Sequence, residues 1–303
     1  MNASELEYHC FGPWILEIKE DYPMPPLFVP YYKESNNYLM LIKVPRNTDR
    51  AHSLPGMDLY QYVIGMYDNY VYILERNGKT VLETKFLYGE IEGIENFTDL
   101  LLGRLTIYLK DRKVKVNYSS VSEDIIINLI KIIRDRYTKK IYKEMPMYNK
   151  ECENLDTLYI NLLHSMKSRG DLMNISAVQP TIKVKATNQS ILKKLLYSLN
   201  QQKLLSSIHL SNDKELLVLS RGKAFKFRSD TILSYSLTYI PIEKIQTITF
   251  VKDETHFNLQ KLYININDYE YIFYIDINSK LLQDYYKNLK SIIDLSSNKL
   301  EIS

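Results

Sequence analysis

The second half of this 303-residue chain repeats the first half in order, although few residues are identical. The clearest correspondence is an apolar stripe in two segments that lie 156 positions apart. The first stripe is Ile125, Ile126, Leu129, Ile130 and Ile133, and the second is Leu281, Leu282, Tyr285, Tyr286 and Leu289. This spacing places each set on one face of a helix, so it predicts two helices with equivalent buried faces.

Three shorter blocks extend the repeat toward the N-terminus, with offsets that drift from 145 to 157. Residues 71–76 match 216–221, residues 91–94 match 242–245, and residues 105–108 match 262–265. Drifting offsets indicate loops of different length between elements in the same order. Chance similarity of amphipathic segments is the alternative. The repeat predicts that Ile125 and Leu281, and likewise Ile91 and Ile242, occupy equivalent positions.

Short β-rich runs precede both helices and predict an α+β chain that is mainly β. Ser122 and Asn278, three residues before the two stripes, are predicted N-caps, and Asn77-Gly78 predicts a hairpin turn. In the first half we expect strands at 38–44, 60–67, 70–75, 81–86, 91–94, 102–109 and 114–118, then a helix at 122–142. In the second half we expect strands at 181–184, 204–210, 215–220, 224–227, 233–239, 242–250, 259–265 and 269–275, and helices at 154–168, 188–200 and 278–295.

The length suits two domains of ordinary size. Five of the ten prolines lie within residues 1–35, which argues against a helix there. We expect residues 1–35 to form an arm that packs on a first domain through Trp14, Ile15, Leu16, Leu27 and Phe28. The first domain is predicted to cover 36–145, a linker containing a helix 146–174, and the second domain 175–303.

Composition restricts the classes of function. The net charge of +3 is a small difference between 39 basic and 36 acidic residues, which argues against nucleic-acid binding. We expect no integral membrane segment and no secretory signal, because no run is long and apolar enough for either. Cys10 and Cys152 are far apart and suit a reducing compartment, so the expected location is cytoplasmic.

Strands followed by a capped helix, twice over, resemble bacterial pleckstrin-homology-like (PH-like) domains. The segments that carry this resemblance are Tyr88–Ile94, Leu100–Leu105 and Tyr118–Val121. The resemblance implies two domains, each a bent antiparallel sheet or partly open barrel closed by its C-terminal helix. It also implies a protein that binds lipid head groups, peptides or other proteins rather than an enzyme. A shared fold does not transfer a function, so the site must be argued separately.

Motifs for catalysis give no candidate. The chain contains no GxGxxG, GxxxxGK[ST], HExxH or GxSxG sequence. The five histidines are isolated and show no ligand spacing, so we expect no catalytic residue, metal or cofactor. An enzyme with a site between domains would need paired titratable groups, and the sequence places none.

The best candidate site is an anion-binding loop over residues 43–52, formed by Lys43, Arg46, Arg50 and His52. In lipid-binding PH domains the corresponding loop carries the cations that hold phosphates. Arginine can grip a phosphate through two parallel N–H donors. The alternative is a solvated loop in which Asp49 neutralises Arg50.

Two further patterns have a structural and a functional interpretation. The first is a basic cluster of Lys131, Arg134, Arg136, Lys139, Lys140 and Lys143. It either offsets the helix dipole or attracts an anionic membrane or acidic partner. The second is a set of alternating tyrosines, among them Tyr60, Tyr62, Tyr70, Tyr72, Tyr269 and Tyr271, which form either half-buried strand faces or a binding surface.

These observations favour a non-enzymatic interaction or scaffold protein. Its exposed strand edges would accept a protein partner by strand addition, or its domains would pair into a homo-oligomer. The alternative is a peripheral protein that binds anionic membrane lipid or a phosphate ligand through the 43–52 loop.

Overall fold

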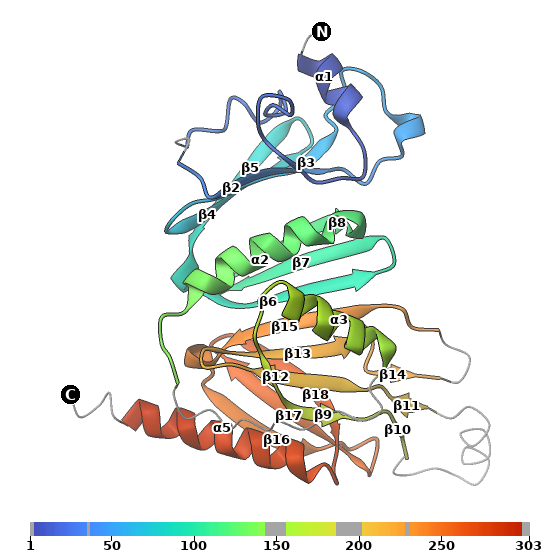
Figure 1. Cartoon of the computed structure of the whole chain (residues 1–303), viewed down its shortest axis with the longest axis vertical. Coiled ribbons are helices and arrows are strands. Elements are labelled where there is room, and N and C mark those ends of the chain that lie inside the picture. The colour runs from blue at the N-terminus through green and yellow to red at the C-terminus, as the bar shows by residue number, and fades with distance from the viewer. Residues whose placement is uncertain (1–2, 35–36, 143–155, 186–201, 228–230, 299–303) are drawn as a thin grey trace. The chain divides into compact units, whose positions relative to one another are not determined.

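The computed structural model describes residues 3–34, 37–142, 156–185, 202–227 and 231–298 (Figure 1). The chain divides into two compact units. The first unit comprises residues 1–91 and 100–138, and the second comprises residues 92–99 and 139–303. Both units are mainly β, with antiparallel sheets and a long helix at the C-terminal end of each. Strand β6 (Ile91–Asp99) contributes almost all its residues to the second unit, which the sequence did not predict.

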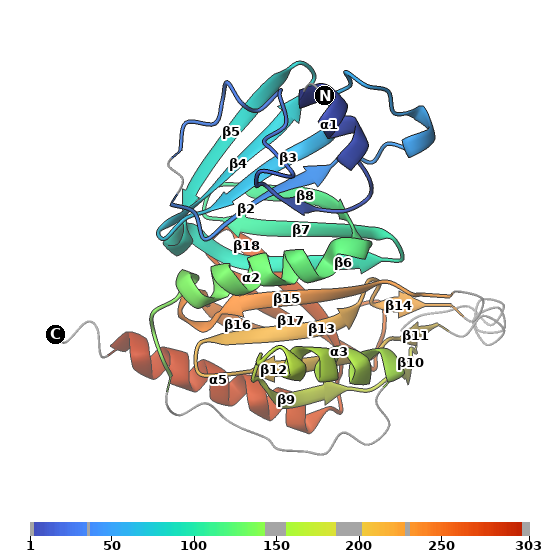
Figure 2. The same cartoon turned by 45° about the horizontal axis from the view of Figure 1, so that its top comes forward.

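The first unit contains a five-stranded antiparallel sheet, followed by a β-hairpin and helix α2 (Glu123–Tyr137). Gly78 has a φ of 65°, and Asn77 pairs with Thr80, so residues 78–79 form the predicted turn in place of 77–78. The sheet has the order β1 (Leu16–Glu17), β2 (Met40–Pro45), β3 (Tyr60–Met66), β4 (Tyr70–Asn77) and β5 (Thr80–Leu87), of which Figure 2 labels β2 to β5. The hairpin is β7 (Leu102–Leu109) and β8 (Lys113–Ser119).

The N-terminal arm packs against one face of this sheet. It begins with a helix, α1 (Ala3–Cys10), where none was expected, because the first proline comes only at Pro13. Ile15 and Phe28 are buried, and Leu16 pairs with Lys43 on β2. Trp14, which was expected to pack on the domain, is instead 56% exposed.

The second unit contains two main sheets and helix α5 (Lys280–Asn298), which packs on β9 and β16 (Figure 1). Its first sheet runs β6, β15 (Tyr235–Pro241), β13 (Glu215–Arg221), β12 (Ser207–Ser211) and β9 (Asn174–Gln179). Its second is β16 (Thr247–Lys252), β17 (Leu259–Ile266) and β18 (Tyr269–Asp276). A small third sheet joins β10 (Ile182–Lys183), β11 (Lys203–Leu204) and β14 (Phe225–Lys226), and helix α3 (Thr157–Ser168) precedes β9.

The two long helices bury the same face. The buried residues of α2 are Ile126, Leu129, Ile130, Ile133 and Tyr137. Every one has a buried counterpart 156 positions later in α5, namely Leu282, Tyr285, Tyr286, Leu289 and Ile293. Ile125 is half-buried and Leu281 is 50% exposed, so both lie at the margin of the stripe.

A short 3₁₀ turn also occurs at matching places, as η2 (Tyr88–Glu90) and η4 (Ile242–Lys244). Each turn is followed by a buried isoleucine whose N–H bonds back to the first residue of the turn. These isoleucines are Ile91 and Ile245. By position in these turns, Ile91 therefore matches Ile245, three residues beyond its predicted counterpart Ile242.

Ser122 occupies the N-cap position of α2 as predicted, but the predicted side-chain capping bond does not form. The Ser122 hydroxyl makes no capping bond in α2 and instead accepts the N–H of Ile15 at 2.9 Å, which fastens the arm. The Asn278 amide donates to Asp276 at 3.2 Å, and α5 begins two residues later at Lys280.

Two predicted boundaries also differ from the structure. Helix α2 ends at Tyr137 rather than at 142, because Thr138 has extended backbone angles. Strand β9 was missed, because its buried residues include the polar Ser176 and Gln179 and its sequence shows no apolar alternation. The predicted helix at 188–200 and residues 146–155 of the predicted linker lie outside the described residues.

Candidate binding pocket of the second unit

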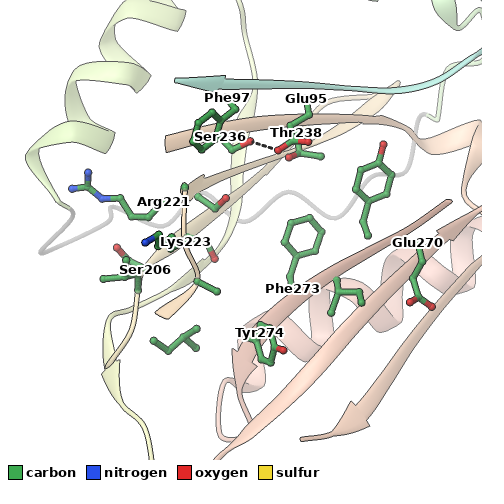
Figure 3. Close-up of a pocket in the computed structure, with 18 residues that line it drawn as sticks. Glu95, Phe97, Ser206, Arg221, Lys223, Ser236, Thr238, Glu270, Phe273 and Tyr274 are labelled. Carbon is green, nitrogen blue, oxygen red and sulfur yellow. Dashed lines mark hydrogen bonds between the residues drawn. The ribbon is translucent and has the colours of Figure 1, made fainter. Parts of the chain in front are cut away.

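A pocket of about 280 Å³ lies within the second unit (Figure 3). Three runs of consecutive residues supply most of its lining: Leu204–Ser207, Ser220–Ala224 and Glu270–Tyr274. Side chains from β15 and β6 complete it, including Ser236, Thr238, Glu95 and Phe97. The pocket is therefore bounded by the ends of β12 and β13, by the first sheet and by β18.

Strand β18 presents its edge to this pocket. Successive side chains of a strand point to opposite faces, so five lining residues in a row mean that the pocket follows the strand edge. Among the described strands, β18 pairs only with β17. Alternate N–H and C=O groups of β18 therefore point to the pocket side, where no other described strand pairs with them.

The two ends of β18 are fixed by local sequence. At its start, Ile266 pairs with Tyr269 across a tight turn, and Asn267 takes a φ of 45°, which asparagine tolerates well. At its end, the N–H of Asp276 donates to the buried Gln179 side chain at 2.8 Å. The Gln179 side chain thus covers the edge of β18 at Asp276. The pocket lies along the rest of this edge, at residues 270–274.

The turn after β13 forms another wall. Arg221 pairs with Asp156, the residue that caps α3 by accepting the N–H of Leu158 at 3.1 Å. Burial would raise the pKa of Asp156, but the Arg221 guanidinium and the Leu158 N–H hold it below its usual value. Lys223, two residues further on, is exposed at the pocket. A Cβ on Gly222 would meet the Ser234 hydroxyl at 2.3 Å, so glycine permits this close approach.

The pocket is polar at its ends and aromatic between them. Figure 3 shows Arg221 and Lys223 at one end, Glu270 at the other, and Phe273 between them. The Ser236 hydroxyl donates to the Glu95 carboxylate at 3.1 Å. Such a lining suits an extended chain with one charge of each sign better than it suits a compact anion.

The four predicted anion-binding residues lie in the first unit, and the side chains of three of them donate hydrogen bonds to backbone carbonyls of that unit. Lys43 is buried in β2 rather than in a loop, and its ammonium donates to the Pro23 carbonyl at 2.8 Å. Burial lowers the pKa of Lys43 to about 8, although Cys10 and Glu7 nearby act in the opposite direction. A buried ammonium with this partner is not placed to hold a phosphate at the surface.

Arg46 and Arg50 are likewise committed to carbonyl groups. Arg46 donates to the Asp58 carbonyl at 2.9 Å. Arg50 donates to the carbonyls of Tyr8 (3.1 Å) and Phe11, at the C-terminal end of α1. A cation there satisfies unpaired carbonyls and the negative end of the helix dipole. His52 is exposed in η1 (Arg50–His52). The bonds of Arg50 to Tyr8 and Phe11 therefore make this loop an anchor for the N-terminal arm.

The basic cluster on α2 is mostly engaged locally. Lys131 pairs with Asp135 at 3.6 Å, and Arg136 donates to the Ile132 carbonyl at 3.3 Å. Lys140 stands 4.9 Å from the Tyr142 ring. Lys139 follows the helix, and Lys143 lies outside the described residues.

The tyrosines of β4 join a network rather than an open surface. Tyr70 donates to Glu34 at 2.6 Å, and Tyr72 donates to Glu83 at 2.6 Å. Lys85 bonds the same Glu34 at 2.8 Å and lies 3.9 Å from the Tyr70 ring centroid. These contacts fasten the end of the arm to β4 and β5.

One exposed apolar surface belongs to the first unit. Leu100, Leu101, Leu102 and Val121 are 66%, 67%, 60% and 51% exposed, and we call them the apolar turn. Leu100 has a φ of 52°, which is costly for leucine. Ser120 holds the turn rigid, because its hydroxyl bonds the Leu100 carbonyl at 2.5 Å and its N–H bonds the Leu101 carbonyl at 3.0 Å.

Comparison with known proteins gives no assignment. No protein-family model matches the chain, and no curated protein sequence matches it significantly. Among the described residues, no three His, Cys, Asp or Glu side chains are grouped closely enough to hold a metal ion. No helix in the described parts of the chain combines the length and apolarity needed to cross a bilayer.

The sequence reasoning missed the pocket residues. Ser206, Lys223 and Glu270 stand in separate blocks with no motif between them. The only available signal was the set of strand candidates around them, which predicts strands but not which edge stays open.

Proposed function

We propose that this chain is a non-enzymatic protein-interaction module whose second unit binds an extended peptide segment of a partner. The peptide would add as a strand to the open edge of β18, with its side chains in the pocket. The observation that carries this proposal is the run Glu270–Tyr274, five consecutive residues that line the pocket along an edge where the described strands supply no second partner.

The order of elements supports two PH-like repeats as the framework of this module. Four strands, a 3₁₀ turn, three strands and a helix occur as β2–β5, η2, β6–β8 and α2. The same order recurs as β9, β12, β13, β15, then η4, β16–β18 and α5, with β10, β11 and β14 as additions. The equivalent buried faces of α2 and α5 support the same interpretation.

Strand addition also has a precedent inside the second unit. Residues Ile94–Thr98 of β6 pair with Tyr239–Tyr235 of β15, although 135 residues lie between the two strands in sequence. Main-chain hydrogen bonds of this kind supply affinity, whereas side-chain pockets supply specificity. The edge of β18 at the pocket, which no described strand covers, offers both features together.

We expect a phage-displayed library of random dodecapeptides, selected on the full chain, to yield peptides that bind at the pocket. Ala224→Trp should weaken their binding by at least about tenfold, because Ala224 is an exposed lining residue and an indole there would occupy the pocket. Titration calorimetry with synthetic copies of the selected peptides measures the effect.

The matched control is Ala51→Trp, at an exposed position of the first unit, which should leave binding within about twofold. Failure to select any peptide would contradict the proposal. So would equal binding to the wild type and to Ala224→Trp.

A second candidate function, contact with a membrane surface, is favoured by the apolar turn alone. Each of its four side chains is more than half exposed, and the Ser120 hydroxyl holds the turn that carries them. Four aliphatic side chains cover far less surface than the ~800 Å² per partner of a stable protein interface. A bilayer needs no matching shape and would accept such a wedge.

On this second proposal, the full chain should co-sediment with phosphatidylcholine vesicles, with little change at raised salt. Leu101→Asp should reduce the bound fraction by about tenfold, because a charge replaces an inserted side chain. Leu172→Asp, at a residue that is 75% exposed in the second unit, is the control and should bind as the wild type does. Binding that is absent, or unchanged in Leu101→Asp, would refute membrane contact.

A further inference from the structure

The pocket has a charge polarity that follows the length of β18. Residues 270 and 274 are four strand positions apart, which corresponds to about 13 Å. The Tyr274 ring packs on Phe225 with centroids 4.6 Å apart. Ala224, next to Phe225, accepts the N–H of Leu205 at 2.8 Å, so the turn that carries Lys223 stands at the Tyr274 end.

The opposite end is acidic. Glu270 begins the lining run and is exposed. A Cβ on Gly93 would lie 2.3 Å from the Tyr271 hydroxyl, so this part of β6 stands beside the start of β18. Glu95, two residues from Gly93 on the same face of β6, also lines the pocket, where its carboxylate accepts the Ser236 hydroxyl.

An aromatic side chain separates these two ends. Phe273 lines the pocket, and Figure 3 shows it between Lys223 and Glu270. An apolar residue of a bound strand would be buried there, whereas charged residues would be favoured only at the ends. Exposed ion pairs contribute little affinity, but they discriminate strongly between matched and reversed charge.

We infer that the pocket selects a peptide with an acidic residue about four positions before a basic residue and with apolar residues between them. This inference rests on the proposed peptide binding. The acidic residue would pair with Lys223 and the basic residue with Glu270. We assign the antiparallel direction, because antiparallel pairs are the more common and slightly more stable. The N-terminal part of the peptide then lies at the Tyr274 end.

The test uses two synthetic peptides of one composition, taken from the selected family. One carries the acidic residue four positions before the basic residue, and the other has these two residues exchanged. The wild-type chain should bind the first about tenfold more tightly at low salt, with a smaller ratio in raised salt. The double variant Lys223→Glu with Glu270→Lys should reverse the preference.

Both substituted residues are exposed, so the double variant should fold as the wild type does, which circular dichroism checks. If both peptides bind equally, and Ala224→Trp blocks both, the inferred polarity is overturned while peptide binding at the pocket stands. If neither these peptides nor the selected library binds, the proposed function fails and the inference fails with it.

Discussion

Replacing Leu282 with alanine is expected to lower the free energy of unfolding of the second unit by about 2–5 kcal/mol. Leu282 is fully buried in α5, and the change removes its burial and leaves a cavity. Its counterpart 156 positions earlier is Ile126, also fully buried, in α2. Ile126→Ala should destabilise the first unit by a similar amount.

Urea denaturation followed by circular dichroism measures the loss, and hydrogen exchange locates it in one unit. The matched control is Leu281→Ala, because Leu281 is adjacent in the helix but 50% exposed. This control should change stability by less than about 1 kcal/mol. Equal losses for Leu281→Ala and Leu282→Ala would show that the assigned helix face is wrong.

Acid is expected to destabilise the second unit through His209. This side chain is fully buried on β12, where its Nδ1 lies 2.6 Å from the Tyr286 hydroxyl of α5 and its Nε2 3.2 Å from the Ser207 hydroxyl. Burial lowers the pKa of His209 to about 3, so it stays neutral in the folded chain. In the unfolded chain it has an ordinary pKa near 6.5.

The contribution of His209 is therefore fully present above pH 6.5 and is lost as the pH falls toward 3. Each pH unit costs about 1.4 kcal/mol, so the expected loss at pH 4.5 is about 3 kcal/mol. The measurement compares the pH profile of unfolding free energy in the wild type and in His209→Gln, which cannot gain a charge. Carboxylates titrate in both proteins, so the difference in slope isolates His209. Identical slopes between pH 6.5 and 4.5 would contradict a neutral buried histidine.

The sequence correctly predicted elements that bury one face and expose the other, because their apolar residues recur with the period of the helix or strand. The predicted apolar stripe of α2 is buried in the structure, and β7 spans the predicted residues 102–109. Local preference failed where a side chain had a distant partner. Ser122 looked like a cap but bonds Ile15, and Lys43 looked like a loop cation but is buried against Pro23.

The pocket depends on information that no local pattern carries. Whether a strand is central or at an edge depends on which other strands reach it, and β18 shows the same alternation in either case. Buried polar residues also hid β9, whose Gln179 determines where the gap beside β18 closes. Long-range pairing of this kind becomes visible only in three dimensions.

The most direct test of the proposed function is hydrogen exchange in β18 with and without a selected peptide. Strand addition predicts that alternate amides within Tyr269–Asp276 exchange at least about tenfold more slowly in the complex, because they gain main-chain acceptors. Slow exchange elsewhere, with β18 unchanged at saturating peptide, would contradict binding at this edge.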